Sequence, residues 1–275
     1  MKFVAQGSCP FDVIVVDEAS QVDVALWVDL GKCHLLGKQV VVLGDFNQFS
    51  PIGDSWKGTP VPDEACEQSQ FLKDICPHRV TLTVNQRSDP PLFAWYSSLI
   101  EGGSRVDMPL ADLLREASAS FPRQPGHVRW NLVLSHKRRV SLNRQLNESE
   151  ARGRAPVLVP APEQRNAPNE PQDMLLWPGL LVMGCLRSGP VQNGCFYKIE
   201  TVDQTHVTLT DGPALTHAAA ARHLRLTYAL TYAACQGLTL EGRVRLWDTG
   251  SPHFTKRHLF VAMSRATAAA NLEIA

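Results

Sequence analysis

The chain has 275 residues, enough for one large domain or two ordinary ones, and 44% of them are apolar, which suffices to fill a core. Its 27 basic and 27 acidic side chains give a formal net charge of zero, so any binding of nucleic acid must use local patches rather than a global attraction. Seven scattered cysteines, no signal peptide and no apolar run near the ~20 residues of a membrane span favour a soluble intracellular protein, cytoplasmic, nuclear or viral, without membrane contact.

A run of β-branched residues from Val13 to Val16 opens the predicted fold. It has no polar break, which predicts a central strand of a parallel sheet, buried on both faces. Asp17 and Glu18 follow directly. Adjacent carboxylates at the end of a buried strand are costly unless a divalent metal or a proton acceptor is needed there. The carboxyl edge of an open α/β sheet is also where ligands bind.

A second buried strand is expected over residues 39–44, after a helix within residues 22–36. Asp17 and Asp45 are 28 positions apart, as 45 − 17 gives, which is close to the ~30 residues of one βαβ unit. We therefore expect the two acids to surface side by side on neighbouring strands.

The middle of the chain alternates strand and helix patterns. Strands are expected over residues 80–84 and 128–134, and helices from the N-cap Asp89 onward and over residues 107–119. Lys137, Arg138 and Arg139 then form, with Arg144, the densest basic cluster. Contact with phosphates and a solvated helix face explain this cluster equally well.

Residues 151–171 have the composition of an exposed loop, and short strands follow it. The Asn193-Gly194 pair indicates a hairpin turn, with strands expected over residues 195–202 and 206–210. Further strands are predicted over residues 244–247 and 271–275. This stretch therefore contains a small β-rich region set within an α/β chain.

Five segments resemble, in order, motifs II to VI of superfamily 1 helicases. They are Val-Ile-Val-Val-Asp-Glu (13–18), Gly-Asp-Phe-Asn-Gln with a proline (44–51), Asn-Gln-Arg-Ser (85–88), a Thr…Gln-Gly-x-Thr pattern (226–242) and Val-Ala-x-Ser-Arg-Ala (261–266). In the fourth, the usual Lys-Ser before Gln-Gly is replaced by Ala234-Cys235. The β-rich region resembles the SH3-like barrel of the RecD/Pif-type branch, which helps to hold single strands there, although a small barrel could equally be a rigid spacer.

The resemblance implies an α/β fold of two RecA-like domains, the first truncated at its N-terminus, with an inserted SH3-like β-barrel. Residues 1–88 would form the partial first domain, residues 89–155 and 222–275 the second, and residues 156–221 the barrel. It further implies ATP and Mg²⁺ as cofactors and ATP hydrolysis coupled to movement along a single strand, usually 5′ to 3′. DNA is favoured over RNA, in replication or repair.

The same resemblance assigns roles to individual residues. Asp17 would help to hold Mg²⁺, and Glu18 would polarise the attacking water. Gln48 would sense the γ-phosphate, and Arg87 and Arg265 would contact it as arginine fingers. Three further residues, Asp45, Gln236 and Gly237, would contact the nucleotide, and Lys137, Arg138, Arg139, Thr231 and Thr239 the nucleic acid.

One departure from the family pattern limits this interpretation. The sequence has no Gly-x-x-x-x-Gly-Lys-Ser/Thr, the loop that cradles the phosphates. We therefore expect the chain to correspond to the C-terminal part of a helicase and to need a missing N-terminal segment or domain that carries this loop. A catalytically inactive nucleic-acid-binding remnant and a structural fragment completed by a partner are the alternatives.

Overall fold

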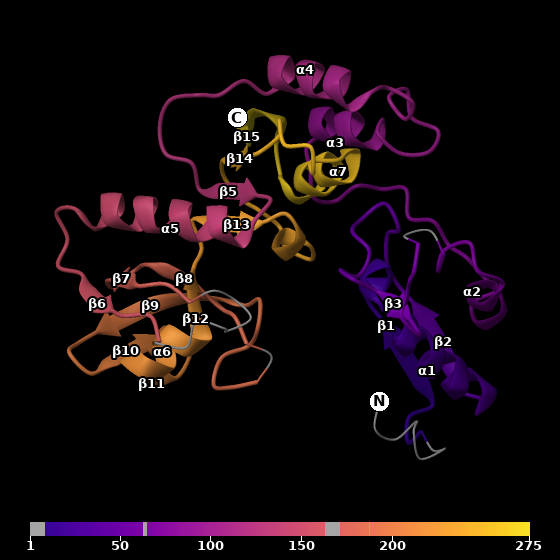
Figure 1. Cartoon of the computed structure of the whole chain (residues 1–275), viewed down its shortest axis with the longest axis horizontal. Coiled ribbons are helices and arrows are strands. Elements are labelled where there is room, and N and C mark those ends of the chain that lie inside the picture. Colours follow the sequence, from indigo (N-terminus) through magenta and orange to yellow (C-terminus); the bar gives the residue numbers. More distant parts are fainter. Residues whose placement is uncertain (1–8, 63–64, 163–170, 187) are drawn as a thin grey trace. The chain divides into compact units, whose positions relative to one another are not determined.

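The computed structural model describes residues 9–62, 65–162, 171–186 and 188–275 (Figure 1). The chain divides into two compact units. The first unit comprises residues up to Val106 together with Lys256–Ser264, and the second comprises Asp107–Thr255 with Arg265–Ala275. The two units are described separately below.

The first unit is built on two parallel strands covered by a helix. Strand β1 pairs with β2 in a register that aligns Val16 with Val42. Helix α1 begins at the N-cap Asp23, whose carboxylate accepts a hydrogen bond from the Leu26 amide at 2.8 Å. The elements are β1 (Val13–Val16), a 3₁₀ turn (Ala19–Gln21), α1 (Val24–Leu35), β2 (Gln39–Val42), the hairpin β3 (Ser55–Trp56) and β4 (Thr59–Pro60), α2 (Gln70–Ile75) and α3 (Pro90–Ser97).

Three expectations for this unit are wrong, and one of them is the burial of β2, in which no residue is fully buried. Strand β1 is not buried on both faces, because α1 covers only one of them: Val16 packs into the core with Trp27, whereas Val13 and Val15 are 49% and 61% exposed. Residues 80–84 form no strand, and their apolar side chains are exposed. The described residues supply no further strand that pairs with β1 or with residues 80–84. Parallel sheets are normally covered by other elements on both faces, so these apolar side chains stay exposed here.

Helix α3 forms as its sequence predicts. The Asp89 carboxylate accepts a hydrogen bond from the Leu92 amide at 3.1 Å, and proline occupies the first turn. The face of α3 that carries Tyr96 packs on α7 (Lys256–Arg265), where the ring centroids of Tyr96 and Phe260 lie 5.8 Å apart. Helix α7 thus belongs to the first unit up to Ser264.

The second unit contains a four-stranded parallel sheet in the order β13-β5-β14-β15. The strands predicted over residues 128–134, 244–247 and 271–275 are confirmed as β5, β14 and β15, and β5 is buried along its whole length. Its elements are α4 (Leu110–Ser120), β5 (Trp130–Val133), α5 (His136–Ala151), β13 (Ala229–Thr231), a 3₁₀ turn (Ala233–Cys235), β14 (Val244–Leu246), a further 3₁₀ turn (Ala269–Asn271) and β15 (Leu272–Ile274).

The small β domain lies between α5 and β13 in the sequence. Five antiparallel strands form a sheet in the order β11-β10-β9-β8-β12, and two more pair beside it around one apolar core. The predicted hairpin at Gly194 and the strands on either side of the next turn are confirmed. The strands and helix are β6 (Val157–Val159), β7 (Met174–Leu176), β8 (Leu181–Gly184), β9 (Phe196–Val202), β10 (His206–Leu209), β11 (Ala214–Thr216), α6 (His217–His223) and β12 (Leu224–Leu226).

The expectation of a loop over residues 151–171 is wrong in part, because α5 continues to Ala151 and β6 follows it. Residues 163–170 lie outside the described part of the chain. Strand β6 pairs antiparallel with β7, and Val159 is fully buried against the core of the small β domain. The proline-rich composition concealed this short strand.

Two asparagines on α5 bind the backbones of two different sheets. The Asn143 side chain accepts from the Ala229 amide at 2.8 Å and donates to the Ala229 carbonyl at 3.1 Å. One turn later, Asn147 makes the same pair of bonds to Leu175, at 2.8 and 2.9 Å. Helix α5 therefore joins β13 of the parallel sheet to β7 of the small β domain. Figure 1 shows α5 beside both strands.

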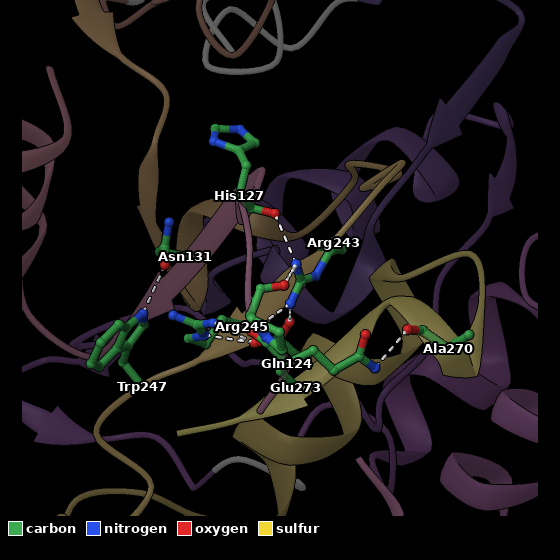
Figure 2. Close-up of polar contacts among 9 residues, drawn as sticks. Gln124, His127, Asn131, Arg243, Arg245, Trp247, Ala270 and Glu273 are labelled. Atoms are coloured by element: carbon green, nitrogen blue, oxygen red, sulfur yellow. Dashed lines mark hydrogen bonds and ion pairs between the residues drawn. The ribbon is translucent and has the colours of Figure 1, made fainter. Parts of the chain in front are cut away.

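A buried carboxylate ties together the strands β14 and β15. Glu273 is fully buried, and Arg245 donates from Nε to its Oε2 at 2.7 Å while Arg243 bonds its Oε1 (Figure 2). Burial alone would raise the pKa of Glu273, but the hydrogen bonds from Arg245 and Arg243 outweigh it and leave the pKa below its usual value. Arg243 also donates to the carbonyls of Pro125 and Gln124 at 2.8 Å, so the loop before β5 is held to the same site.

Replacing Asn143 by alanine is expected to lower the free energy of unfolding by about 2–4 kcal/mol. The substitution leaves the buried N–H and C=O of Ala229 without partners, and each unpaired buried group costs about 1–3 kcal/mol. Urea unfolding measures the effect. The control is Gln145→Ala, at an exposed position of the same helix, which should change stability by less than about 0.5 kcal/mol. Equal stability of the two variants would contradict the assigned role.

Candidate functional site

The turn after β1 holds the first candidate residues in a constrained conformation. Glu18 has φ 51° and ψ 50°, in the left-handed region that non-glycine residues rarely adopt. The Asp17 carboxylate accepts a hydrogen bond from the Glu18 amide at 2.8 Å, which fixes the turn. Asp17 is exposed and Glu18 is partly buried. Such conformations cost about 1–3 kcal/mol and cluster at functional sites, so this turn is a candidate site on geometric grounds.

The end of β2 lies against this turn. The Leu43 amide donates to the Val16 carbonyl at 2.7 Å, and the Ala19 amide donates to the Leu43 carbonyl at 3.0 Å. A Cβ atom on Gly44 would lie 2.6 Å from the Ala19 nitrogen, so only glycine fits at this point. Gly44, the first residue of the segment that resembles motif III, is thus in direct contact with the turn that follows motif II.

The motif III turn is built from its own side chains. Asp45 Oδ1 accepts from the Asn47 amide at 2.9 Å and from the Asn47 side chain at 2.8 Å, and the Gln48 amide donates to the Asp45 carbonyl at 3.1 Å. The Gln48 side chain is buried, and its Oε1 has no hydrogen-bond partner among the described residues. A buried side-chain amide with an unpaired hydrogen-bonding atom is unusual, and such a group is suited to binding a ligand.

Arg87 is linked to the helix that carries motif VI. Its Nη1 donates to the Ser264 carbonyl at 3.0 Å, near the C-terminus of α7. The Arg87 amide donates to Asn85 Oδ1 at 3.2 Å, so the residue lies in a turn that is held by its neighbour. Motif IV and the residue before Arg265 are therefore in contact within the first unit.

Helix α7 makes a second contact, this one with motif III, which the sequence analysis did not predict. Arg257 Nη1 donates to Ser50 Oγ at 3.3 Å, and the rings of Phe49 and His258 meet edge to face at 4.7 Å between centroids. Burial, with a smaller contribution from the charge of Arg257, lowers the pKa of His258 to about 4. An aromatic residue and a histidine on separate elements give no periodic pattern, so sequence reasoning missed them.

The motif V residues lie in the second unit. Thr231 is buried, and its Oγ1 accepts from the Ala234 amide at 3.2 Å, so it caps the 3₁₀ turn that follows. Gly237 has φ 73°, and the buried Gln236 Nε2 has no partner among the described residues. Thr239 is exposed. The chain then returns to motif VI, because the Leu240 amide donates to the Arg265 carbonyl at 2.8 Å, and Arg265 itself is 3% exposed.

The basic cluster divides into exposed and buried members. Ser135 caps α5 by accepting from the Arg138 amide at 3.1 Å, which places Lys137 and Arg138 on the exposed first turn. Arg139 is 1% exposed and presents no surface to a strand. Of the three residues expected to contact nucleic acid here, only Lys137 and Arg138 are accessible.

A cavity of about 210 Å³ in the first unit adjoins the motif II turn. Within the part of the chain that the structure describes, it is lined mainly by apolar side chains, including Trp27, Phe46 and Phe71, and by one acid, Asp54. None of the described residues that line it is a lysine or an arginine, so this lining does not suit a triphosphate. Among the described residues, no three potential metal-binding side chains cluster together, and no helix could cross a membrane.

Comparison with solved structures identifies the fold. Pif1 helicase from Candida albicans superposes with a TM-score of 0.66 at 20% identity, covering 96% of this chain and 71% of that one. The chain has the fold of the Pif1 helicases. Pif1 from Bacteroides, solved with ADP-AlF3 and single-stranded DNA, gives a TM-score of 0.60 at 16% identity, over 96% of this chain and 70% of that one. No protein-family model matches, and no curated protein matches.

The Pif1 fold agrees with the mixed α/β sheets described above and with the resemblance to superfamily 1 helicases. A further structure of Bacteroides Pif1, bound to single-stranded DNA, gives a TM-score of 0.63 at 17% identity. About 30% of the length of these Pif1 chains has no counterpart here, since the covered share is 70–71%.

Substituting Gly44 by alanine is expected to destabilise the first unit by about 1–3 kcal/mol, as overpacking usually does. The added Cβ would meet backbone atoms of Ala19, which can only shift with the whole motif II turn. Urea unfolding followed by tryptophan fluorescence tests this. Gly250→Ala is the matched control, because a Cβ there meets nothing within 4 Å. A tolerated Gly44→Ala would refute the close approach.

The stability of the first unit should fall as the pH drops from about 6.5 to about 4. In that window the unfolded chain protonates His258 and the folded chain keeps it neutral, so acid favours unfolding. The substitution His258→Phe preserves the ring contact with Phe49 and should flatten this part of the pH profile. Melting temperatures between pH 4 and 7.5 measure it, with His253→Asn as an exposed control. An unchanged slope in His258→Phe would count against the assignment.

Proposed function

We propose that this chain is the C-terminal part of an ATP-dependent superfamily 1 helicase or translocase of the RecD/Pif type. The observation that carries the proposal is the left-handed Glu18 at the carboxyl end of β1, packed through Gly44 against the motif III turn. Strained acidic residues at the carboxyl edge of a parallel sheet suit catalysis rather than packing. The likeness to Pif1 structures, which include complexes with ADP-AlF3 and with single-stranded DNA, supports the same function.

The donor set at this edge fits Mg²⁺ bound with a nucleotide. Protein Mg²⁺ sites at phosphates use one or two carboxylates, and waters and phosphate oxygens complete the shell. The exposed Asp17 supplies one such carboxylate, and the metal would neutralise the charge on the phosphates. Glu18 polarises the attacking water, and Gln48, with its unmatched buried oxygen, reads the presence of the γ-phosphate. Asp45 orders the loop that carries Gln48.

Arg87 and Arg265 are assigned to the γ-phosphate through the resemblance. An arginine finger in related NTPases accelerates hydrolysis by ~10³-fold or more. The bond from Arg87 to the carbonyl of Ser264, next to Arg265 in the chain, supports a shared role for the two arginines. Gln236 and Gly237 complete the nucleotide contacts in this proposal.

The nucleic-acid contacts are assigned to the second unit. Lys137 and Arg138 would contact the backbone of a single strand, and the exposed Thr239 would add a further contact. Thr231 supports that path by capping its 3₁₀ turn rather than by direct contact. We assign residues 156–221 to an SH3-like barrel inserted in the second RecA-like domain, and we favour DNA over RNA because the matched structures contain DNA.

A further segment is needed to complete the first domain, and it would carry the phosphate-binding loop. Support comes from the two-stranded sheet, whose outer face exposes Val13 and Val15, and from the exposed Leu82 in the unpaired stretch 80–84. Two isolated parallel strands are marginal in water, whereas added strands would cover these side chains. An inactive nucleic-acid-binding remnant is the alternative function, and the exposed Lys137 and Arg138 would serve it without a phosphate-binding loop.

The proposal predicts that Glu18→Gln abolishes ATP hydrolysis but spares strand binding. Loss of a general base typically costs about 10²–10⁴-fold in rate, whereas Lys137 and Arg138, the proposed strand contacts, are unchanged by this substitution. ATPase stimulation by an oligothymidylate is measured on the chain joined to its upstream coding region, and on the chain alone. Glu101→Gln, at an exposed turn position after α3, is the control and should leave turnover unchanged.

Three outcomes separate the candidates. Stimulated ATPase that Glu18→Gln removes supports the helicase. Strand binding without ATPase in either form overturns the helicase in favour of the remnant. Turnover that survives Glu18→Gln, or the absence of strand binding, overturns the proposed function.

A further inference from the structure

Trp247, directly after β14 in the second unit, is surrounded by three guanidinium groups. The Cζ atoms of Arg138, Arg123 and Arg245 lie 5.3, 5.5 and 5.8 Å from its ring centroid. Among the described residues, each of the other stacked rings, those of Trp95, Trp130 and Trp177, has one such arginine. One guanidinium over an exposed ring gains about 0.5–1 kcal/mol. Three like charges around one ring also repel each other, which an anion would relieve.

The charges of this cluster are only partly compensated. Glu273 holds Arg245 in an ion pair of 2.6 Å and is shared with Arg243. Asp248 Oδ1 lies 3.9 Å from Arg138 Nε, at the limit of an ion pair. Arg123 is exposed, and the described residues place no carboxylate within ion-pair distance of it. The face around Trp247 is therefore locally positive on a chain with no net charge.

The ring is itself held in place. Trp247 donates from Nε1 to the buried Asn131 side chain at 2.9 Å, as Figure 2 shows, and Asn131 in turn donates to the Tyr228 carbonyl at 2.9 Å. Stacking on a fixed ring restricts the arginines before any ligand binds, which reduces the entropy lost on binding. Since both distances are to one centroid, the Cζ atoms of Arg123 and Arg138 are at most about 11 Å apart.

Two neighbouring features add to the positive potential. Arg138 lies in the first turn of α5, where the helix dipole is positive, and the exposed Lys137 precedes it. This end of α5 follows β5, so the cluster lies at the carboxyl edge of the parallel sheet, the edge where such sheets bind ligands.

We propose that Arg123, Arg138 and Trp247 form a face that binds the phosphodiester backbone of a single nucleic-acid strand. The two accessible arginines contact phosphate oxygens, and Trp247 positions them, with Arg245 fixed by Glu273 on the same ring. The contact is to backbone rather than base, so DNA and RNA strands are bound alike at this face. This inference rests on the proposed function, because it names the part of the second unit that the strand contacts.

Arg123→Gln and Arg138→Gln are each expected to weaken strand binding about tenfold, as the loss of a charge-assisted hydrogen bond does. Each should also make the slope of log affinity against log salt shallower by about 0.7, the value for one lost phosphate contact on a single strand. Fluorescence anisotropy with labelled oligothymidylate and oligouridylate, at several salt concentrations, measures both quantities. The two strands should show parallel losses.

Two further variants separate contact from structure. Arg129→Gln removes a guanidinium stacked on Trp130 at 4.9 Å, away from Trp247, and should leave affinity and slope unchanged. Trp247→Leu keeps every charge, so it should weaken binding without changing the slope. Urea unfolding verifies that each variant is folded.

The inference is overturned if Arg123→Gln and Arg138→Gln behave like Arg129→Gln. If they do so while the chain still binds strands and Glu18→Gln still removes ATPase, only this face is wrong. Losses confined to one type of strand would also overturn it, because they would indicate base or sugar recognition. Absence of strand binding by the unmodified chain would instead count against the proposed function itself.

Discussion

The contact between Gly44 and Ala19 constrains the two loops that carry the acidic residues of the first unit. Two loops that each carry acidic residues approach so closely that no side chain fits between them. Hydrogen bonds from Leu43 to Val16 and from Ala19 to Leu43 extend the pairing of β1 and β2 beyond the strand ends. Carboxylates that would repel each other in water are thus fixed at one sheet edge by backbone contacts, and their positions do not depend on their charge.

In the second unit, buried polar side chains fix the positions of the elements by hydrogen bonds. Asn143, Asn147 and Glu273 are all buried, and each is hydrogen-bonded to groups distant in sequence. A buried polar group that is fully matched specifies a single arrangement, because any shift would leave it unpaired. The parallel sheet, the small β domain and the loop before β5 are therefore fixed relative to one another within this unit by specific bonds as well as by apolar packing.

Local patterns in the sequence sufficed for most elements and for the order of the motifs. The cap at Asp89, the turn at Gly194 and the acids after β1 all act through neighbours in the chain, so their effects can be predicted. The exposure of Val13 could not be predicted from the sequence, because the burial of a strand depends on which other strands lie beside it. Likewise, helical position alone does not tell whether Arg139 faces solvent or the interior.

The asparagine bonds of α5 have a consequence for how such a chain can vary. The small β domain is inserted between β5 and β13, two strands that are direct neighbours in the sheet. Because Asn143 attaches β13 to the helix that immediately follows β5, the alignment of these strands is set by residues outside the insertion. Loops within the insertion can therefore lengthen or shorten without disturbing the register of the sheet that receives it.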